Sequence, residues 1–201
     1  MHSASDLRSS QIWEIAKRRI KRVLVGHQQE VYSLDFSRDG RLIISGSVDN
    51  TIRIWGLDGG CHRVLTISDN DNSQHSSVTS VTISPDATLV AAGNLDTIVR
   101  IWDVATGTLL KRLRGHEDGI YSVAFTSDGK GLVSGSLDKS VKYWDVTVLA
   151  AGSAESKLEN AIPTPALLGS NSGDRSEVSC TMDFVGHKVG MSDFRNDLMF
   201  I

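Results

Sequence analysis

One short stretch of the 201-residue chain holds a serine, a histidine and an aspartate. It runs "GHEDGIYSVAFTSDGKGLVSGSLDKSVKYWD" over residues 115–145 and contains His116, Ser134 and Asp138. In a hydrolase, such an aspartate orients the histidine, and the histidine deprotonates a nucleophilic serine. The same three side chains can instead form a buried chain of hydrogen bonds that only holds the fold together.

An internal repeat decides between these two interpretations. Residues 26–55 align with residues 115–144 without a gap, and residues 77–103 carry the pattern again. In both gap-free copies the histidine lies 22 residues before an aspartate, and the aspartate lies six before a tryptophan. An enzyme needs one triad at one pocket, whereas a structural network is needed once per repeat. The constant spacing therefore favours a structural role, and we expect neither catalytic residues nor an enzyme.

The elements around these residues are predicted to be β-strands. The segments "VYSLDFS", "VTSVTIS" and "IYSVAFT" alternate in hydrophobicity with a period of two, which favours strands. The segments "SRDG", "SPDA" and "TSDG" that follow them are typical turns. Each unit of about 40–45 residues accommodates four strands, as a β-propeller blade does.

The Gly-His and Trp-Asp pairs of these units resemble the WD-repeat family. The resemblance implies an all-β fold: a WD-repeat β-propeller fragment with three complete four-stranded blades and partial blades at both ends. It also implies that each blade holds a structural tetrad. These tetrads are His27, Ser45, Asp49 and Trp55 in the first blade, His75, Asp96 and Trp102 in the second, and His116, Ser134, Asp138 and Trp144 in the third.

Two features of these tetrads stay open. Ser47 and Ser136 lie close enough in sequence to replace Ser45 and Ser134 as the serine member. In the middle blade Ala92 occupies the serine position. We therefore expect an incomplete hydrogen-bond network there, in a blade that packing mainly holds.

The repeat predicts the domain boundaries. They are an unassigned N-terminus (1–10), the last strands of a truncated blade (11–25), a blade (26–67), a blade with a polar insertion (68–113), a blade with a long loop at 147–179 (114–185), and the start of a further blade with a divergent tail (186–201). The repeat pattern ends after Lys188, and we expect truncation or translation into an intron, with a genuine divergent tail as the alternative. Because three blades leave open flanks, we expect the chain alone to self-associate or to be poorly soluble.

The composition argues against several classes of protein. The net charge of −3 and the lack of a long apolar run predict no direct contact with nucleic acid or membrane. Cys61 and Cys180 have no metal-ligand spacing, and we expect no metal, no cofactor and no small-molecule substrate. The basic run at 17–22, "KRRIKR", is either a nuclear import signal or a solvated strand-and-turn surface.

A more specific resemblance lies in the exact sequence segments of the repeats. The segments "GHQQEVYSLDFS", "AAGNLDTIVRIWD" and "GIYSVAFTSDGKGLVSGSLDKSVKYWDV" and the later "FVGHK" resemble the fungal Tup-type transcriptional corepressors. This implies a nuclear protein-interaction scaffold (alternatively a cytoplasmic one) whose partners are sequence-specific repressors and chromatin or corepressor subunits. It also implies partner-binding positions at the start of each first strand, namely Tyr32, Thr79 and Tyr121.

Three alternatives to the corepressor interpretation remain. A WD-repeat chain can serve as the substrate receptor of a ubiquitin ligase, or as a scaffold that resembles a G-protein β-subunit. A truncated product would have no independent function.

Overall fold

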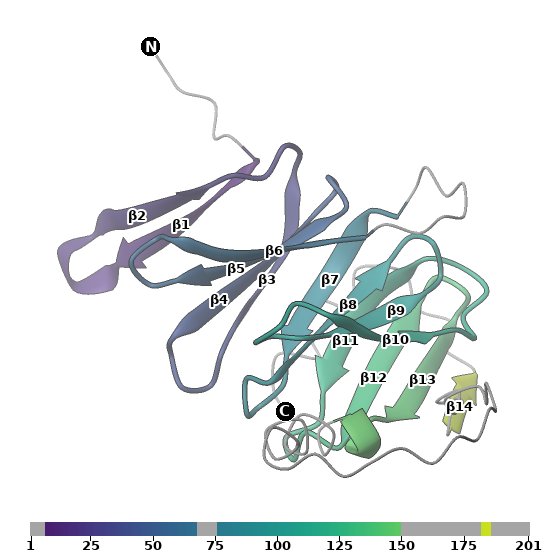
Figure 1. Ribbon diagram of the computed structural model, residues 1–201. Helices are drawn as coiled ribbons and strands as arrows, with labels where there is room; N and C mark the ends of the chain where they lie inside the picture. The colour runs from purple at the N-terminus through teal and green to yellow at the C-terminus, as the bar shows by residue number, and fades with distance from the viewer. Residues whose placement is uncertain (1–6, 68–75, 150–181, 186–201) are drawn as a thin grey trace, which may run out of the picture.

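Antiparallel sheets follow one another along the chain in the computed structural model, which describes residues 7–67, 76–149 and 182–185 (Figure 1). The first sheet has two strands, β1 (Ser9–Glu14) and β2 (Arg19–Val25), joined through the 3-10 turn η1 (Ile15–Lys17). The second has β3 (Val31–Phe36), β4 (Leu42–Ser47), β5 (Thr51–Gly56) and β6 (Cys61–Thr66). The third has β7 (Val78–Ile83), β8 (Leu89–Asn94), β9 (Val99–Asp103) and β10 (Leu109–Leu113). The fourth has β11 (Ile120–Phe125), β12 (Gly131–Ser136), β13 (Ser140–Asp145) and β14 (Met182–Val185).

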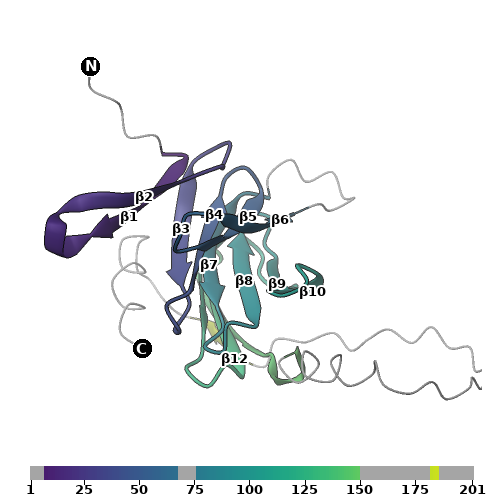
Figure 2. The same ribbon diagram turned by 60° about the vertical axis from the view of Figure 1, so that its left-hand side comes forward.

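Within each four-stranded sheet every strand pairs with its neighbour in the sequence. The predicted all-β fold, with four-stranded sheets as in a partial propeller, is confirmed. The β1–β2 hairpin lies at one end of the row of sheets (Figures 1 and 2). No helix in the described ranges is long and apolar enough to cross a membrane.

The structure changes two details of the predicted boundaries. β1 begins at Ser9, which pairs with Val25, two residues before the predicted strand. Residues 147–149 are helical rather than part of a loop, because the Asp145 carboxylate accepts bonds from the Thr147 N–H and hydroxyl, as a helix cap does. The rest of the predicted loop, most of the polar insertion, His75 and the divergent tail lie outside the described residues.

The basic run at 17–22 lies at the end of η1 and in β2, where these residues are exposed. Lys17 and Arg19 form ion pairs with Glu14 at 2.7 and 3.0 Å. The run is thus exposed strand-and-turn surface in this structure, and its use as a nuclear import signal stays a prediction.

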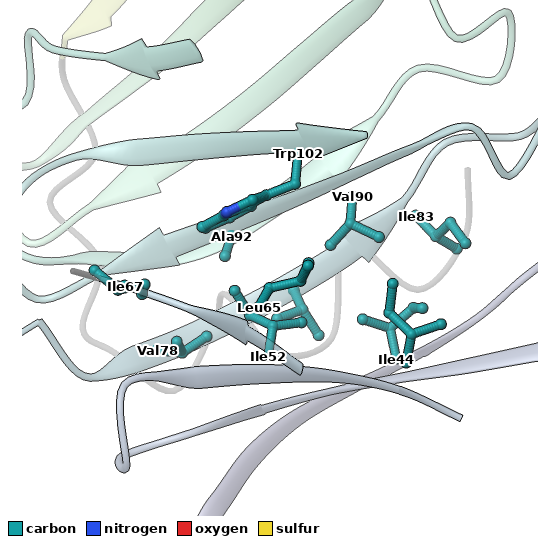
Figure 3. Packing of buried hydrophobic residues seen from close by; sticks show 11 residues of the cluster. Ile44, Ile52, Leu65, Ile67, Val78, Ile83, Val90, Ala92 and Trp102 are labelled. Carbon is teal, nitrogen blue, oxygen red and sulfur yellow. The ribbon is translucent and has the colours of Figure 1, made fainter. Parts of the chain in front are cut away.

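The hydrophobic core lies between neighbouring sheets. One cluster joins the second and third sheets, with Ile44, Ile52 and Leu65 facing Val90 and Trp102 (Figure 3). A second cluster joins the third and fourth sheets, and its members include Leu89, Ile101, Ile120, Leu132 and Trp144. Neighbouring blades therefore bury their apolar faces against each other, as repeat architectures do.

Glycines in the second strands allow this close approach. A methyl group at Gly93 would lie 2.7 Å from Ile120 Cγ2 and 3.1 Å from Val123 Cγ1. Gly46 occupies the equivalent position one sheet earlier, where an added methyl group would lie 2.5 Å from Val78 Cγ1. Since the contacting atoms are on β-branched side chains with few alternative rotamers, these positions have no room for a side chain.

Polar contacts also join the sheets. Ser33 Oγ accepts the Val81 N–H at 3.0 Å. One sheet later, Ser80 Oγ accepts the Val123 N–H at 3.2 Å. At the outer edge the Arg63 guanidinium donates to two carbonyls of the turn at residues 105–106, at 2.6 and 2.9 Å. Inner-strand contacts thus join each successive pair of four-stranded sheets, and an outer contact also joins the second sheet to the third.

β3 presents an apolar face that no neighbouring sheet covers in the described part of the chain. Leu34 is 53% exposed, whereas its equivalents Val81 and Val123 are 4% and 6% exposed. Phe36 is 49% exposed, whereas its equivalent Ile83 is 7% exposed. An exposed apolar sheet face favours association, so self-association of the isolated chain stays a prediction.

We predict that Gly93→Ala lowers the free energy of unfolding by about 1–3 kcal/mol, because the added methyl overpacks the interface between the third and fourth sheets. The measurement is urea unfolding of the 201-residue chain followed by tryptophan fluorescence. Gly60→Ala is the control, since a methyl there meets only Asp58 at ordinary contact distance. Equal effects of the two changes would contradict the packing account.

Candidate functional site

The first tetrad forms an unbroken chain of hydrogen bonds. Trp55 Nε1 lies 2.8 Å from Ser45 Oγ, Ser45 Oγ lies 2.7 Å from His27 Nε2, and His27 Nδ1 lies 2.9 Å from Asp49 Oδ2. An indole N–H can only donate, so the serine oxygen accepts it and the single serine proton goes to Nε2. The proton of a neutral imidazole is then on Nδ1 and points at the aspartate.

The third blade repeats this chain almost unchanged. His116 Nδ1 to Asp138 Oδ2, His116 Nε2 to Ser134 Oγ, and Trp144 Nε1 to Ser134 Oγ are all 2.8 Å. The histidine and tryptophan rings meet edge to face at 67°, compared with 65° in the first blade. The same network therefore forms twice from the same spacing.

The structure also separates the two serines that the sequence left open. Ser45 and Ser134 lie at the centre of the networks. Ser47 and Ser136 instead donate to the carbonyls of Gln29 and Asp118 in the preceding loops.

The aspartate of each network fastens two segments that are distant in sequence. Asp49 Oδ2 accepts the Gln28 N–H at 2.8 Å, and Asp49 Oδ1 accepts the Thr51 N–H and hydroxyl at 2.9 and 2.6 Å. Asp138 does the same for the Glu117 and Ser140 amides at 2.9 and 2.8 Å. Each tetrad thus ties the loop before the first strand to the turn between the second and third strands.

These networks are not built for catalysis, although they place serine, histidine and aspartate in the order of a hydrolase triad. Ser45 and Ser134 have no exposed surface. Each hydroxyl already contacts both an indole N–H and an imidazole nitrogen. A nucleophile must reach its substrate, and these two hydroxyls cannot.

The middle blade uses a different device. Asp96 binds the Arg100 guanidinium through both oxygens, at 3.0 and 2.7 Å, and Arg100 is 1% exposed. We expected this blade to be held mainly by packing, and the buried ion pair is an addition to that account. The predicted histidine of this blade, His75, lies outside the described residues.

The sequence offers a weak signal for this ion pair. An arginine follows the turn aspartate by four residues in both the first and second blades. In the first blade, however, His27 is already hydrogen-bonded to the aspartate, Asp49. The Arg53 guanidinium lies over the Trp55 ring instead, 5.8 Å from its centre. The same spacing therefore has two outcomes, and a single sequence does not distinguish them.

The surroundings shift the acidities of the network members. Burial lowers the pKa of His27 below its usual value, against the opposing effect of its bond to Asp49. Burial alone would raise the pKa of Asp49, but the hydrogen bonds from Thr51, Gln28 and His27 outweigh it and lower that pKa. The pKa of Asp138 is lowered in the same way. A neutral histidine and an ionised aspartate thus agree with the proton positions derived above.

Two of the three expected partner-binding residues are exposed. Tyr32 is 61% and Tyr121 is 38% exposed. Thr79 differs, because its hydroxyl donates to the Gly93 carbonyl at 2.8 Å and to the Ile120 carbonyl. Its polar group therefore joins β7 to β8 and β11, while a role of Thr79 in partner binding stays a prediction. Among the described residues, no group of three or more His, Cys, Asp or Glu side chains could hold a metal ion.

We predict that Ser134→Ala lowers the free energy of unfolding by about 2–4 kcal/mol. The change leaves the Trp144 indole N–H and the His116 Nε2 buried without their shared partner. Ser122→Ala makes the same chemical change on the neighbouring strand and serves as the control in urea unfolding. A cost below 1 kcal/mol for Ser134→Ala would refute the role of this network in stability.

The buried ion pair of the middle blade gives a second prediction. Arg100→Met should cost about 3–5 kcal/mol because it leaves the Asp96 carboxylate buried without its cation. Adding Asp96→Asn to the same chain should recover part of that loss, as a double-mutant cycle would measure. Additive effects of the two substitutions would show that the pair is not coupled.

The shifted pKa values predict that acid destabilises the fold in two stages. The pKa of His27 is lowered in the folded chain, so the unfolded chain binds its proton first as the pH falls below about 6.5. The aspartates follow, because the unfolded chain protonates them near pH 4 while the folded chain resists. Urea unfolding at pH 7.5, 5.5 and 4 should therefore give steadily lower free energies of unfolding. His27→Gln should reduce the first decrease, and a rise in stability on acidification would contradict the assignment.

Comparison with known proteins agrees with the geometry. The family model described as WD domain, G-beta repeat matches residues 18–56, 62–103 and 107–145. Autophagy-related protein 16 of Arabidopsis thaliana is 28% identical over 113 residues, which are 55% of this chain and 21% of that protein. Human WD repeat-containing protein 36 is 42% identical over 53 residues, which are 26% of this chain and 6% of that protein.

The U3 small nucleolar RNA-associated protein 21 of Saccharomyces cerevisiae is 50% identical over 44 residues, 21% of this chain and 5% of that protein. The matched parts therefore span about a fifth or less of these relatives. The family model, in contrast, covers more than half of the chain and includes every member of the two complete tetrads. The chain belongs to the WD domain, G-beta repeat family.

Proposed function

We propose that this chain acts as a non-enzymatic protein-interaction scaffold. The observation that carries the proposal is the exposure of Tyr32 and Tyr121 next to loops that the buried tetrads hold in place. Tyrosine provides a large contact area and a hydroxyl at a small cost in conformational entropy, as residues that dominate binding interfaces do. The network serines are buried and fully engaged, which supports a binding role over a catalytic one.

The more specific proposal is a corepressor scaffold. The sequence segments that resemble Tup-type corepressors support recruitment by DNA-bound repressors, with chromatin or corepressor subunits as further partners and the nucleus as the location. The relatives reported above do not include such a corepressor, so this step rests on the sequence resemblance alone.

A second candidate is a scaffold or substrate receptor in another complex, such as a ubiquitin ligase. The relatives carry names from autophagy and from small nucleolar RNA-associated proteins, and this variety favours keeping the alternative. In that case the same face would bind partners of another class, in the cytoplasm or the nucleus.

Affinity purification of the full-length protein with quantitative mass spectrometry tests both candidates. Tyr32→Ala and Tyr121→Ala should each reduce the recovery of the same partners about tenfold or more, while Val64→Ala on the outer strand β6 should not. Repressors and chromatin subunits among those partners would support the corepressor proposal, and ligase subunits would support the alternative. Unchanged recovery from both tyrosine variants would contradict the scaffold surface itself.

A further inference from the structure

The end of the third and fourth sheets that carries the tetrad loops has an exposed apolar surface. Leu95, Tyr121 and Leu137 are 36%, 38% and 49% exposed. Gly119 lies between the two leucines: its carbonyl accepts the Leu137 N–H at 2.9 Å, and a methyl group on it would lie 3.1 Å from Leu95 Cδ2. Tyr121 follows Gly119 by two residues on β11. We call this set, residues 95, 119, 121 and 137, the Leu–Tyr surface.

The loop beside the Leu–Tyr surface is fixed before any partner binds. The Glu117 N–H donates to Asp138, the Ser136 hydroxyl donates to the Asp118 carbonyl at 2.9 Å, and the Gly119 N–H donates to the Asp118 carboxylate at 2.7 Å. A surface that needs no ordering on binding loses less entropy and binds more tightly for its area. The tetrad of the third blade thus shapes this surface as well as stabilising the blade.

The charges around the Leu–Tyr surface are mainly negative. Glu117 and Asp118 are exposed on the loop, and neither forms an ion pair with another side chain in the described part of the chain. Lys139, also exposed, lies next to the turn of Leu137. Two carboxylates against one ammonium favour a cationic partner and disfavour phosphate backbones and anionic lipid headgroups.

We propose that the Leu–Tyr surface binds a cationic peptide segment in which a large apolar side chain has a lysine or arginine close by. The apolar side chain of the peptide packs between Leu95, Tyr121 and Leu137 and covers their exposed apolar atoms. The basic side chains lie towards Glu117 and Asp118. This inference rests on the proposed scaffold function and adds to it the chemistry of the partner.

The test uses random 12-residue peptides displayed on phage and selected on the immobilised 201-residue chain. The selected peptides should be enriched in lysine or arginine together with leucine, methionine or phenylalanine. Fluorescence anisotropy of the recovered peptides should show affinity reduced tenfold or more by Leu137→Asn and by the double change Glu117→Lys and Asp118→Lys. Val64→Asn on β6 is the control and should leave affinity within twofold of the parent chain.

Three results would overturn the inference: peptides without an excess of basic residues, affinities unchanged by Leu137→Asn, or no enrichment above bare resin. Failure of the scaffold function is a separate result, because it appears in the purification of partners with Tyr32→Ala and Tyr121→Ala. Neutral or acidic peptides that still require Tyr121 would overturn the cationic partner while the scaffold function stands.

Discussion

A single buried serine hydroxyl is the contact on which each complete blade depends. It accepts the indole N–H of the third-strand tryptophan and donates to the histidine of the preceding loop. Without it, two polar groups in the core would lose their partners at once, and such loss costs more than the bond itself contributes. The histidine then passes the constraint to the aspartate in the turn. The loop, the second strand, the turn and the third strand of each complete blade are thereby held in one geometry.

The middle blade shows which part of this network can be replaced. Alanine stands at the serine position, and the turn aspartate binds a buried arginine instead. The turn is still fastened to the third strand, but through an ion pair whose partners are only four residues apart. The common requirement is therefore a satisfied aspartate at the turn, and the histidine of the complete tetrads is one of two ways to meet it. The interface glycines and the serine bridges between sheets are the features that make neighbouring blades interdependent.

Much of this arrangement can be predicted from the sequence, because the repeated units show the histidine, aspartate and tryptophan at constant spacing. Two gap-free copies predict the strands, the turns and the two complete tetrads, since the same spacing in the same fold brings the same four side chains together. The Asp96–Arg100 pair could not be predicted, because Arg53 has the same spacing and a different contact. The hydrogen bonds of Thr79 to Gly93 and Ile120 could not be predicted either, since they depend on how two sheets pack. The Leu–Tyr surface has the same origin: Leu95 and Leu137 belong to different sheets and meet only across Gly119.

The central claim is that the buried tetrad holds the loop that shapes the exposed surface. Amide hydrogen exchange at Glu117, measured by NMR on the 201-residue chain, tests this most directly, because that N–H donates to the tetrad aspartate. We expect Ser134→Ala to speed exchange at Glu117 tenfold or more. The Gly40 amide, which donates to Ser37 in a distant turn, should keep its rate. Exchange at Glu117 that is as slow in Ser134→Ala as in the parent chain would contradict the account.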